Sequence, residues 1–418
     1  MILACSHCGT LHELVPLPPR TTAFCEVCEN PLERTSGRSI SAALACASAT
    51  LLLLFPANLL PFLRVSLLGV SRVSRLGSGV VELWNHQWVL VAMLVAAFAV
   101  ILPFVRYGLL TTVLALVLLE HKARWVGRGF RWALALDAWS MPDVFLLGLA
   151  VGYSRIVATL PVTIGWGGFC FIGAAFLSML SRAALDRRTV WRSIPIEQPG
   201  LQVDTPLISC TACDLVVPAK DEGSCCPRCG LRLHTRKPDA LMRTLALAIA
   251  GFVLYIPANT YPMSTDSQLG QLVPHRIIDG IVELYRAGLW PLGILIFCTS
   301  IAIPFLKLAG LGWFLASIYR RSGRRLRTKT RLYRLIHEIG RWSNTDVFTI
   351  VVFVPLLQFG ALASAHAATG ATAFILVVVL TMLATRAFDP RLMWDAALQD
   401  APDAPSAAAL PRALQSAP

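Results

Sequence analysis

Long apolar stretches separated by short polar segments dominate the chain. Each is about as long as the ~17–25 residues that a helix needs to cross a ~30 Å hydrocarbon core. The pattern predicts an all-α polytopic membrane protein with eight spans. Pro103 and Pro304 fall inside the two longest stretches, so we expect tilt or a kink there. The stretches cover residues 40–63, 88–119, 142–161, 164–180, 241–262, 288–318, 346–363 and 370–385.

Composition and charge agree with this pattern. The chain is 56% hydrophobic and 15% charged, which excludes an ordinary soluble protein. Its net charge of +13 gathers in segments 121–131, 181–192 and 319–334, between apolar stretches. Lys and Arg collect in cytoplasmic loops, so we expect both termini on the cytoplasmic side. Solvated loops explain the basic runs better than nucleic-acid binding, since no regular aromatic pattern accompanies them. Binding of anionic lipid headgroups by 319–334 is compatible with this interpretation.

The N-terminus "MILACSHCGT" is polar and lacks the charged-then-apolar pattern of a signal peptide. We therefore expect the first apolar stretch to insert as a true span.

The same motifs occur twice along the chain. Pro-Ala-Asn-x-x-Pro closes the first apolar stretch at 56–61 and again at 257–262. "VELW" and "VELY" follow at the same offset of 201 residues, and "WSMPDVF" (139–145) matches "WSNTDVF" (342–348). The chain is thus predicted to be two tandem repeats of four spans, and an even number of spans makes the repeats parallel.

The repeated Pro-Ala-Asn motif predicts a break in the helix. Proline removes a backbone donor, and the asparagine side chain can bond the freed backbone or line an opening. Irregular backbone at membrane depth is tolerated only where protein or water covers it. The motif therefore predicts either a rigid exit turn or the mouth of a cavity.

Two Cys-x-x-Cys pairs precede each set of four spans. Two such pairs can supply four thiolates to one tetrahedral metal ion, as in zinc ribbons. We favour two structural zinc ions, with iron or dithiol redox chemistry as alternatives. Disulfides are disfavoured, because both modules are predicted on the reducing side. Cys225 beside Cys226 leaves one ligand open. The predicted ligands are Cys5, Cys8, Cys25, Cys28, Cys210, Cys213, Cys226 and Cys229.

These features divide the chain into five parts. Each four-cysteine, zinc-ribbon-like module is followed by a transmembrane module of four helices, and the Ala/Pro-rich end is predicted to be disordered. The predicted bounds are 1–37 and 193–236 for the cysteine modules, 38–192 and 237–396 for the transmembrane modules, and 397–418 for the tail.

Ionisable groups at bilayer depth usually face a cavity or a partner. Lys307 and Arg106 lie within apolar stretches at matching positions. They mark a functional site, or else a structural ion pair between helices. Asp143 and Asp346 each begin a predicted helix, so N-capping is the alternative to a functional role. Glu82 and Glu283 precede a span and are expected to cap it or to form salt bridges.

Together these motifs resemble the paraquat-inducible protein A family, bacterial inner-membrane proteins of MCE lipid-transport systems. The motifs that carry the resemblance are the doubled cysteine pairs, PAN-x-x-P, VELW/VELY, WS-x-x-DVF and the "RAFD" at 386–389. The resemblance covers residue 1 to about 396.

The resemblance implies a phospholipid-transport subunit in the bacterial inner membrane. It would load or unload lipid for a periplasm-spanning MCE-domain partner. It also implies a polar transport cavity chiefly in the second transmembrane module. In the first half, Met141-Pro142 replaces Asn344-Thr345, so we expect the first half to be scaffold. The implied site residues are Lys307, Ser343, Thr345 and Asp346, to which we add Asn259 of the repeated motif.

Two other functions compete with lipid transport. Iron-bound cysteine modules would make the chain a redox membrane protein, although its eight histidines offer few pairs within spans. The chain could also be a non-transporting anchor or assembly factor of an envelope complex. The sequence has no GxxxxGK[ST] phosphate-binding loop, so we expect no nucleotide site and a driving force that comes from a partner or the proton gradient. We expect a transport subunit and not an enzyme. Asp346 beside Lys307 would be a candidate proton-linked pair, because buried pairs shift pKa values.

Overall fold

The computed structural model places nearly all of the predicted elements. It describes residues 2–13, 18, 21–34, 39–67, 70–85, 88–121, 123, 125–157, 161–195, 207–268, 271–340, 342 and 363–399.

Helices dominate the first membrane half, and α1 packs along α7 and α4. The helices are α1 (Ile40–Leu59), α2 (Ser78–Asn85), α3 (Val89–Val95), α4 (Leu102–Leu118), α5 (Val126–Ala135), α6 (Pro142–Val157), α7 (Trp166–Ala184) and α8 (Arg187–Ser193). A 3-10 turn, η2 (Leu136–Ala138), joins α5 to the segment before α6.

The second half has the same order of elements as far as it is described, and α9 packs along α15. Its helices are α9 (Ala240–Thr260), α10 (Ile277–Arg286), α11 (Trp290–Ile296), α12 (Ile303–Tyr319), α13 (Leu326–Ile339), α15 (Thr369–Ala387) and α16 (Arg391–Leu398).

Seven helical segments in the described part of the chain are long and apolar enough to cross a membrane. The predicted span 346–363 lies outside the described residues, so it stays a prediction. The third candidate span, Val126–Ser154, begins earlier than the predicted 142–161, because it includes α5 and η2. The interpretation of 121–131 and 319–334 as solvated loops was therefore incomplete: α5 and α13 lie there, and Phe130 and Lys329 are buried.

Small sheets stand at one end of the helices, so the all-α prediction was wrong in this respect. Strands β5 (Leu63–Leu67), β6 (Val70–Ser74) and β7 (Val162–Ile164) form one antiparallel sheet, ordered β6-β5-β7. In the other half β10 (Ser264–Gln268), β11 (Gln271–His275) and β12 (Ala363–Ala367) are ordered β11-β10-β12. Leu63 pairs with Ser74, and Ser264 pairs with His275, in equivalent registers.

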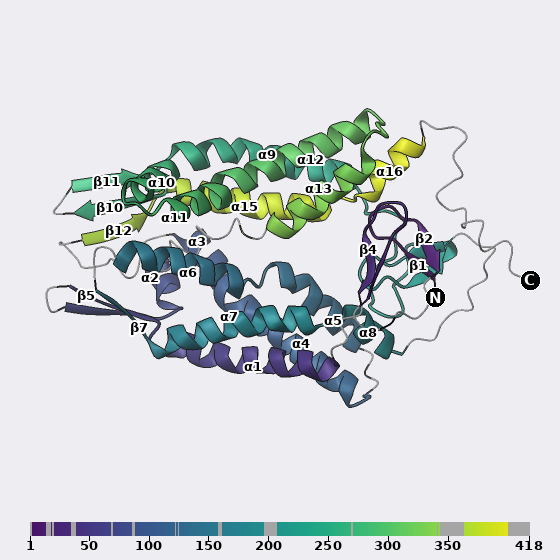
Figure 1. Cartoon of the computed structure of the whole chain (residues 1–418), viewed down its shortest axis with the longest axis horizontal. Coiled ribbons are helices and arrows are strands. Elements are labelled where there is room, and N and C mark those ends of the chain that lie inside the picture. Colours follow the sequence, from purple (N-terminus) through teal and green to yellow (C-terminus); the bar gives the residue numbers. More distant parts are fainter. Residues whose placement is uncertain are drawn as a thin grey trace, which may run out of the picture.

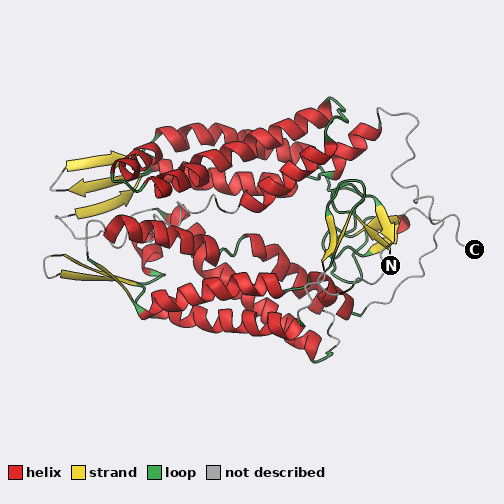
Figure 2. Ribbon diagram, in the orientation of Figure 1, coloured by secondary structure: helices red, strands yellow, loops and turns green. Residues whose placement is uncertain are grey.

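The cysteine modules lie at the opposite end of the helices from these sheets (Figures 1 and 2). Each is built from short antiparallel hairpins. The hairpins are β1 (Ile2–Ala4) with β2 (Leu11–Glu13), β3 (Thr22–Phe24) with β4 (Pro31–Arg34), and β8 (Leu207–Ser209) with β9 (Val216–Pro218). A further turn of the second module, outside the named strands, is closed by an antiparallel bridge between Cys225 and Arg232.

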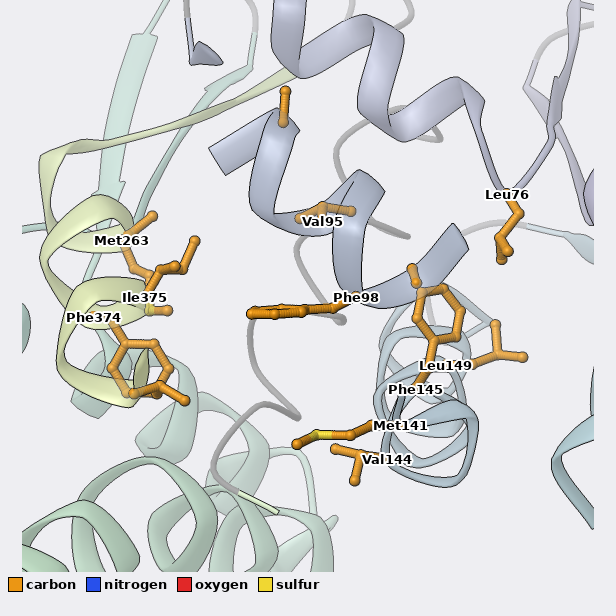
Figure 3. Close-up of a cluster of buried hydrophobic side chains, with 14 of the residues drawn as sticks. Leu76, Val95, Phe98, Met141, Val144, Phe145, Leu149, Met263, Phe374 and Ile375 are labelled. Atoms are coloured by element: carbon orange, nitrogen blue, oxygen red, sulfur yellow. The ribbon is translucent and has the colours of Figure 1, made fainter. Parts of the chain in front are cut away.

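One apolar cluster joins the two halves and reaches the end of the molecule where the sheets lie. Phe98 and Met141 of the first half lie in the same buried cluster as Phe374 and Ile375 of α15. Phe98 stacks on Trp139, with ring centroids 5.5 Å apart. Figure 3 shows Phe98 between the labelled residues of α15 and those near the start of α6. The halves are thus held together by side-chain packing within the membrane-spanning region.

The repeated proline does not break the helix where the sequence suggested. Pro56 and Pro257 lie inside α1 and α9, which continue to Leu59 and Thr260. The Nδ2 group of Asn58 donates to the carbonyl of Leu54 at 2.8 Å, and Asn259 does the same to Tyr255. In an α-helix the carbonyl freed by Pro56 is that of Leu52, so Asn58 does not replace the lost bond. Each helix ends within one turn of its proline, at Leu59 and Thr260.

A widened turn precedes the second proline of each half. Residues Ala96–Ile101 (η1) and Phe297–Ala302 (η4) form π-helices directly before α4 and α12. Pro103 and Pro304 are the second residues of α4 and α12, which continue these π-helices without a break, so each proline lies inside one long helix. π-turns are rare and concentrate at functional sites, and sequence periodicity alone did not indicate them.

Candidate metal centres and a buried lysine

Four turns with the same backbone bonds hold the eight predicted cysteines. In each, the residue after the second cysteine donates its amide to the first cysteine's carbonyl, at 2.8–3.0 Å. That residue has positive φ each time, which glycine adopts most easily. The four residues are Gly9, Glu29, Asp214 and Gly230.

The turns bring their sulfurs together in two buried groups. Within each group all four Sγ atoms lie within 4.8 Å of one another. Cys5 and Cys28, Cys8 and Cys25, and Cys210 and Cys229 are 3.5 Å apart, and Cys213 and Cys226 are 3.6 Å apart. Zinc–sulfur bonds of ~2.3 Å in a tetrahedron place sulfurs about 3.8 Å apart. Both groups therefore fit one tetrahedral metal ion each, and iron would use the same four sulfurs.

The open ligand question at the Cys225-Cys226 pair has a geometric answer. Cys226 is 2% exposed and belongs to the second group, whereas Cys225 is exposed and paired by its backbone with Arg232. The predicted choice of Cys226 agrees with this placement.

The second cysteine module is seated on the first membrane half. Its cysteines share a buried cluster with Val126 and Phe130 of α5 and with Trp191 of α8. At Gly127 a β-carbon would stand 1.9 Å from the backbone oxygen of Arg228, so the two backbones touch. The module thus packs on the half that precedes it, although it is joined directly to α9.

The first module is seated mainly on the second half. Trp394 of α16 packs against its cysteine cluster. The ring of His7 meets Tyr333 of α13 edge-on, with centroids 6.0 Å apart. Burial lowers the pKa of His7 to about 4, so the ring is neutral at pH 7. Glu33 adds a link to the first half, 2.6 Å from Arg192 of α8. The two modules therefore cross over, and each packs on the other's membrane half.

A buried charge network lies within the first half. Arg106, 3% exposed, contacts Asp137 at 2.6 Å, and Arg182 contacts the same carboxylate at 2.9 Å. Arg182 also reaches Asp143 at 2.8 Å. Arg106 therefore takes the role of a structural inter-helix ion pair, which was one of the two alternatives. Asp143 has a buried partner beyond helix capping. Asp137 and Arg182 were missed from sequence.

The second half differs at the equivalent position. Lys307 is 1% exposed, and its Nζ has no hydrogen-bond partner among the described residues. A β-carbon on Gly340 would stand 2.7 Å from Lys307 Cε. In the WS-x-x-DVF alignment Gly340 occupies the place of Asp137. Where the first half has a carboxylate, the second half thus has a glycine. This exchange, two residues before the aligned tryptophans, was the available sequence signal.

The other predicted site residues are only partly placed. Asn259 is half-buried in the last turn of α9. Ser343, Thr345 and Asp346 lie outside the described residues, so their proximity to Lys307 stays a prediction. Glu283 is exposed on α10, and Glu82 lies on α2.

Comparison with known proteins gives consistent matches over most of the chain. The family described as paraquat-inducible protein A matches residues 40–195 and 241–397. "Intermembrane transport protein PqiA" of Escherichia coli (strain K12) is 29% identical over 406 residues, covering 94% of this chain and 95% of that protein. "Lipophilic envelope-spanning tunnel protein A" of the same strain is 28% identical over 397 residues, covering 94% and 91%.

A third relative comes from another genus. "Probable intermembrane transport protein" of Haemophilus influenzae is 27% identical over 404 residues, covering 94% of this chain and 95% of that protein. No solved structure matches the chain.

Proposed function

The chain belongs to the paraquat-inducible protein A family, and from this premise we propose that it moves phospholipid at the bacterial inner membrane for a periplasmic MCE-domain partner. The coarser part, membrane transport, follows from relatives named as intermembrane transport proteins over nearly their whole length. The finer part is our proposal that the cargo is phospholipid, that the partner is an MCE-domain protein and that the location is the inner membrane. Such names describe transport, in agreement with a chain that is not an enzyme.

Lys307 is the single observation that carries the choice of site. Lys307 has no hydrogen-bond partner in the part of the chain that the structure describes. Because burying an ammonium is costly, such a group is expected where it meets a ligand, an ion or a moving partner. Its first-half counterpart Arg106 is neutralised by Asp137. We therefore assign the transport site to the second half, built from Lys307 and Asn259 with Ser343, Thr345 and Asp346. The first half is the scaffold.

The orientation follows from charge. Six exposed arginines lie at the cysteine-module end of α12 and α13, at 320, 321, 324, 325, 327 and 331. Positive residues favour the cytoplasmic side, so the modules face the cytoplasm and the two sheets face the periplasm, where the partner would bind. The proposed architecture is two tandem repeats with eight spans, within the bounds predicted from sequence, and two zinc ions in the modules.

Photo-crosslinking tests the lipid site. A benzophenone amino acid is placed at Lys307 or Thr345, with Arg106 and Pro142 as matched positions in the first half. Cells are labelled with radioactive phosphate and irradiated, and the purified protein is counted. We expect label at the second-half positions alone. Equal label in both halves would contradict the scaffold role of the first half. Label at neither pair, on folded and metal-loaded protein, would reject the lipid site.

Metal analysis separates the redox alternative from transport. Two zinc ions in each colourless molecule agree with structural modules. Two iron ions with a visible absorption band would favour electron transfer instead.

A further inference from the structure

The contact between the first module and α13 centres on Glu29. Its carboxylate lies 3.5 Å from Arg327 and forms an ion pair with Arg331. Its backbone carbonyl accepts from Arg334 at 3.3 Å, and the neighbouring carbonyl of Val27 accepts from Arg327 at 2.9 Å. Three arginines spaced along one helix thus converge on one turn of the cysteine module.

The conformation of Glu29 depends on the knuckle that contains it. Glu29 directly follows the ligand Cys28, and its φ is 58°. A residue other than glycine is sterically strained in this left-handed region. The bond from its amide to the carbonyl of Cys25, at 2.8 Å, belongs to the closed knuckle. Metal binding closes such knuckles, so it also fixes the direction in which Glu29 presents its carboxylate and carbonyl.

Helix α13 leads from this contact to the membrane site. It begins near Arg327 and ends at Ile339, and Gly340 directly after it meets the side chain of Lys307. Along the way Tyr333 donates to the carbonyl of Thr385 on α15 at 3.1 Å. A helix is a stiff element, so a change in the contacts that hold the N-terminal part of α13 is transmitted to its C-terminal end.

We propose that Glu29 is a positioning residue that transmits metal occupancy of the first cysteine module through α13 to Gly340 and Lys307. An exposed ion pair adds little to stability by itself. The role assigned here is therefore to hold α13 in one position, with the global fold supported by burial elsewhere. The link to transport rests on the proposed function, whereas the coupling from the module to α13 does not.

The second module offers a matched control. Asp214 occupies the equivalent position after Cys213, also with positive φ (55°). It faces Arg188 of α8 in the first half at 4.0 Å. Gly9 and Gly230 occupy the same position in the other two knuckles. Glu29→Gly and Asp214→Gly therefore keep the knuckle backbone and remove the carboxylate alone.

Amide hydrogen exchange of the full-length protein in lipid nanodiscs tests the proposal. We expect Glu29→Gly to keep two metal ions and to speed exchange of α13 at least about threefold, through more frequent local opening. Asp214→Gly should leave α13 unchanged. Cys25→Ser should remove one ion and speed α13 as Glu29→Gly does. Glu29→Arg combined with Arg331→Glu should restore part of the protection that Glu29→Arg alone removes.

Two results would overturn the inference. One is α13 exchange unchanged in both Glu29→Gly and Cys25→Ser. The other is acceleration in Cys25→Ser with none in Glu29→Gly, which would assign the coupling to His7 and Trp394 instead. Phospholipid crosslinking at Lys307 in the Glu29→Gly variant is measured separately. If α13 loosens and crosslinking stays normal, the coupling stands and only its link to transport fails.

Discussion

The side chain of Lys307 occupies the space beside Gly340 that any larger residue would need. A β-carbon there would stand 2.7 Å from Lys307 Cε and 3.3 Å from its Nζ. The backbone of Gly340 has an ordinary helical φ of −56°, so the glycine serves this close approach and no special conformation. The glycine at position 340 thus leaves room for the end of the Lys307 side chain.

Gly340→Ala is expected to displace the far end of the Lys307 side chain, and because that end is flexible the cost in stability should be about 1 kcal/mol, the lower end of the range for overpacking. Denaturant unfolding in mixed micelles measures the free energy, and phospholipid crosslinking measures the site. Gly312→Ala on α12 is the control, since nothing lies within 4 Å of a β-carbon there. Equal stability of the two variants would mean that Lys307 has room to move.

Gly127→Ala is expected to disrupt the packing of the second cysteine module against α5. The added carbon would stand 1.9 Å from the carbonyl oxygen of Arg228, and backbone cannot yield as a flexible side chain does. Faster amide exchange over 207–233, with both metal ions retained, is the expected result. Gly108→Ala on α4 has open space and should leave exchange unchanged. Unchanged exchange in both variants would argue against the crossed seating.

Cys226→Ser is expected to lower the metal content from about two ions to about one per chain, since one lost thiolate leaves an incomplete cage. Cys225→Ser should retain both ions, because Cys225 is exposed and lies outside the group. Elemental analysis of the purified protein measures the count. Loss of an ion in Cys225→Ser instead would reverse the ligand assignment.

Asp143→Asn is expected to cost about 3 kcal/mol. This is the lower end of the range for breaking a buried pair, because Arg182 keeps Asp137 at 2.9 Å. Unfolding in micelles measures it. Glu283→Gln, at an exposed position on α10, is the control and should change stability by about 0.5 kcal/mol or less. Lipid crosslinking at Lys307 should survive Asp143→Asn if the first half is scaffold.

Local features were the most predictable part of this molecule. The knuckles depend on bonds within six residues, so the cysteine spacing was sufficient to predict both groups of four. The apolar runs predicted most spans for the same reason, since length and hydropathy are local properties. The outer strands escaped prediction in part because β5 pairs with β7 about a hundred residues away. The local signal was nevertheless available and was missed, since the sequence of β5, LRVSL, alternates apolar and polar residues as a half-buried strand does.

Long-range contacts could not be predicted from pattern. Asp137 lies at the boundary of a basic segment, where a carboxylate looks solvated, yet Arg106 and Arg182 meet it in the folded chain. The crossed seating of the modules depends on surfaces about 300 residues apart for the first module and about 100 residues apart for the second, and no periodicity encodes it. Lys307 was predicted from its depth, whereas Gly340 became informative only beside the lysine.

The crossed packing of the two modules also determines the order in which they dock during synthesis. Glu29 and Arg327 are 298 residues apart, and chains grow at roughly 5–20 residues per second. The first module therefore leaves the ribosome about 15–60 s before its docking helix exists. Its two hairpins depend on local bonds only, but the module must wait undocked while the first membrane half inserts. The second module meets a finished surface as soon as it emerges. A nascent chain stalled before α13 would thus carry the second module docked and the first module undocked. The first module to be synthesised would therefore be the last to dock.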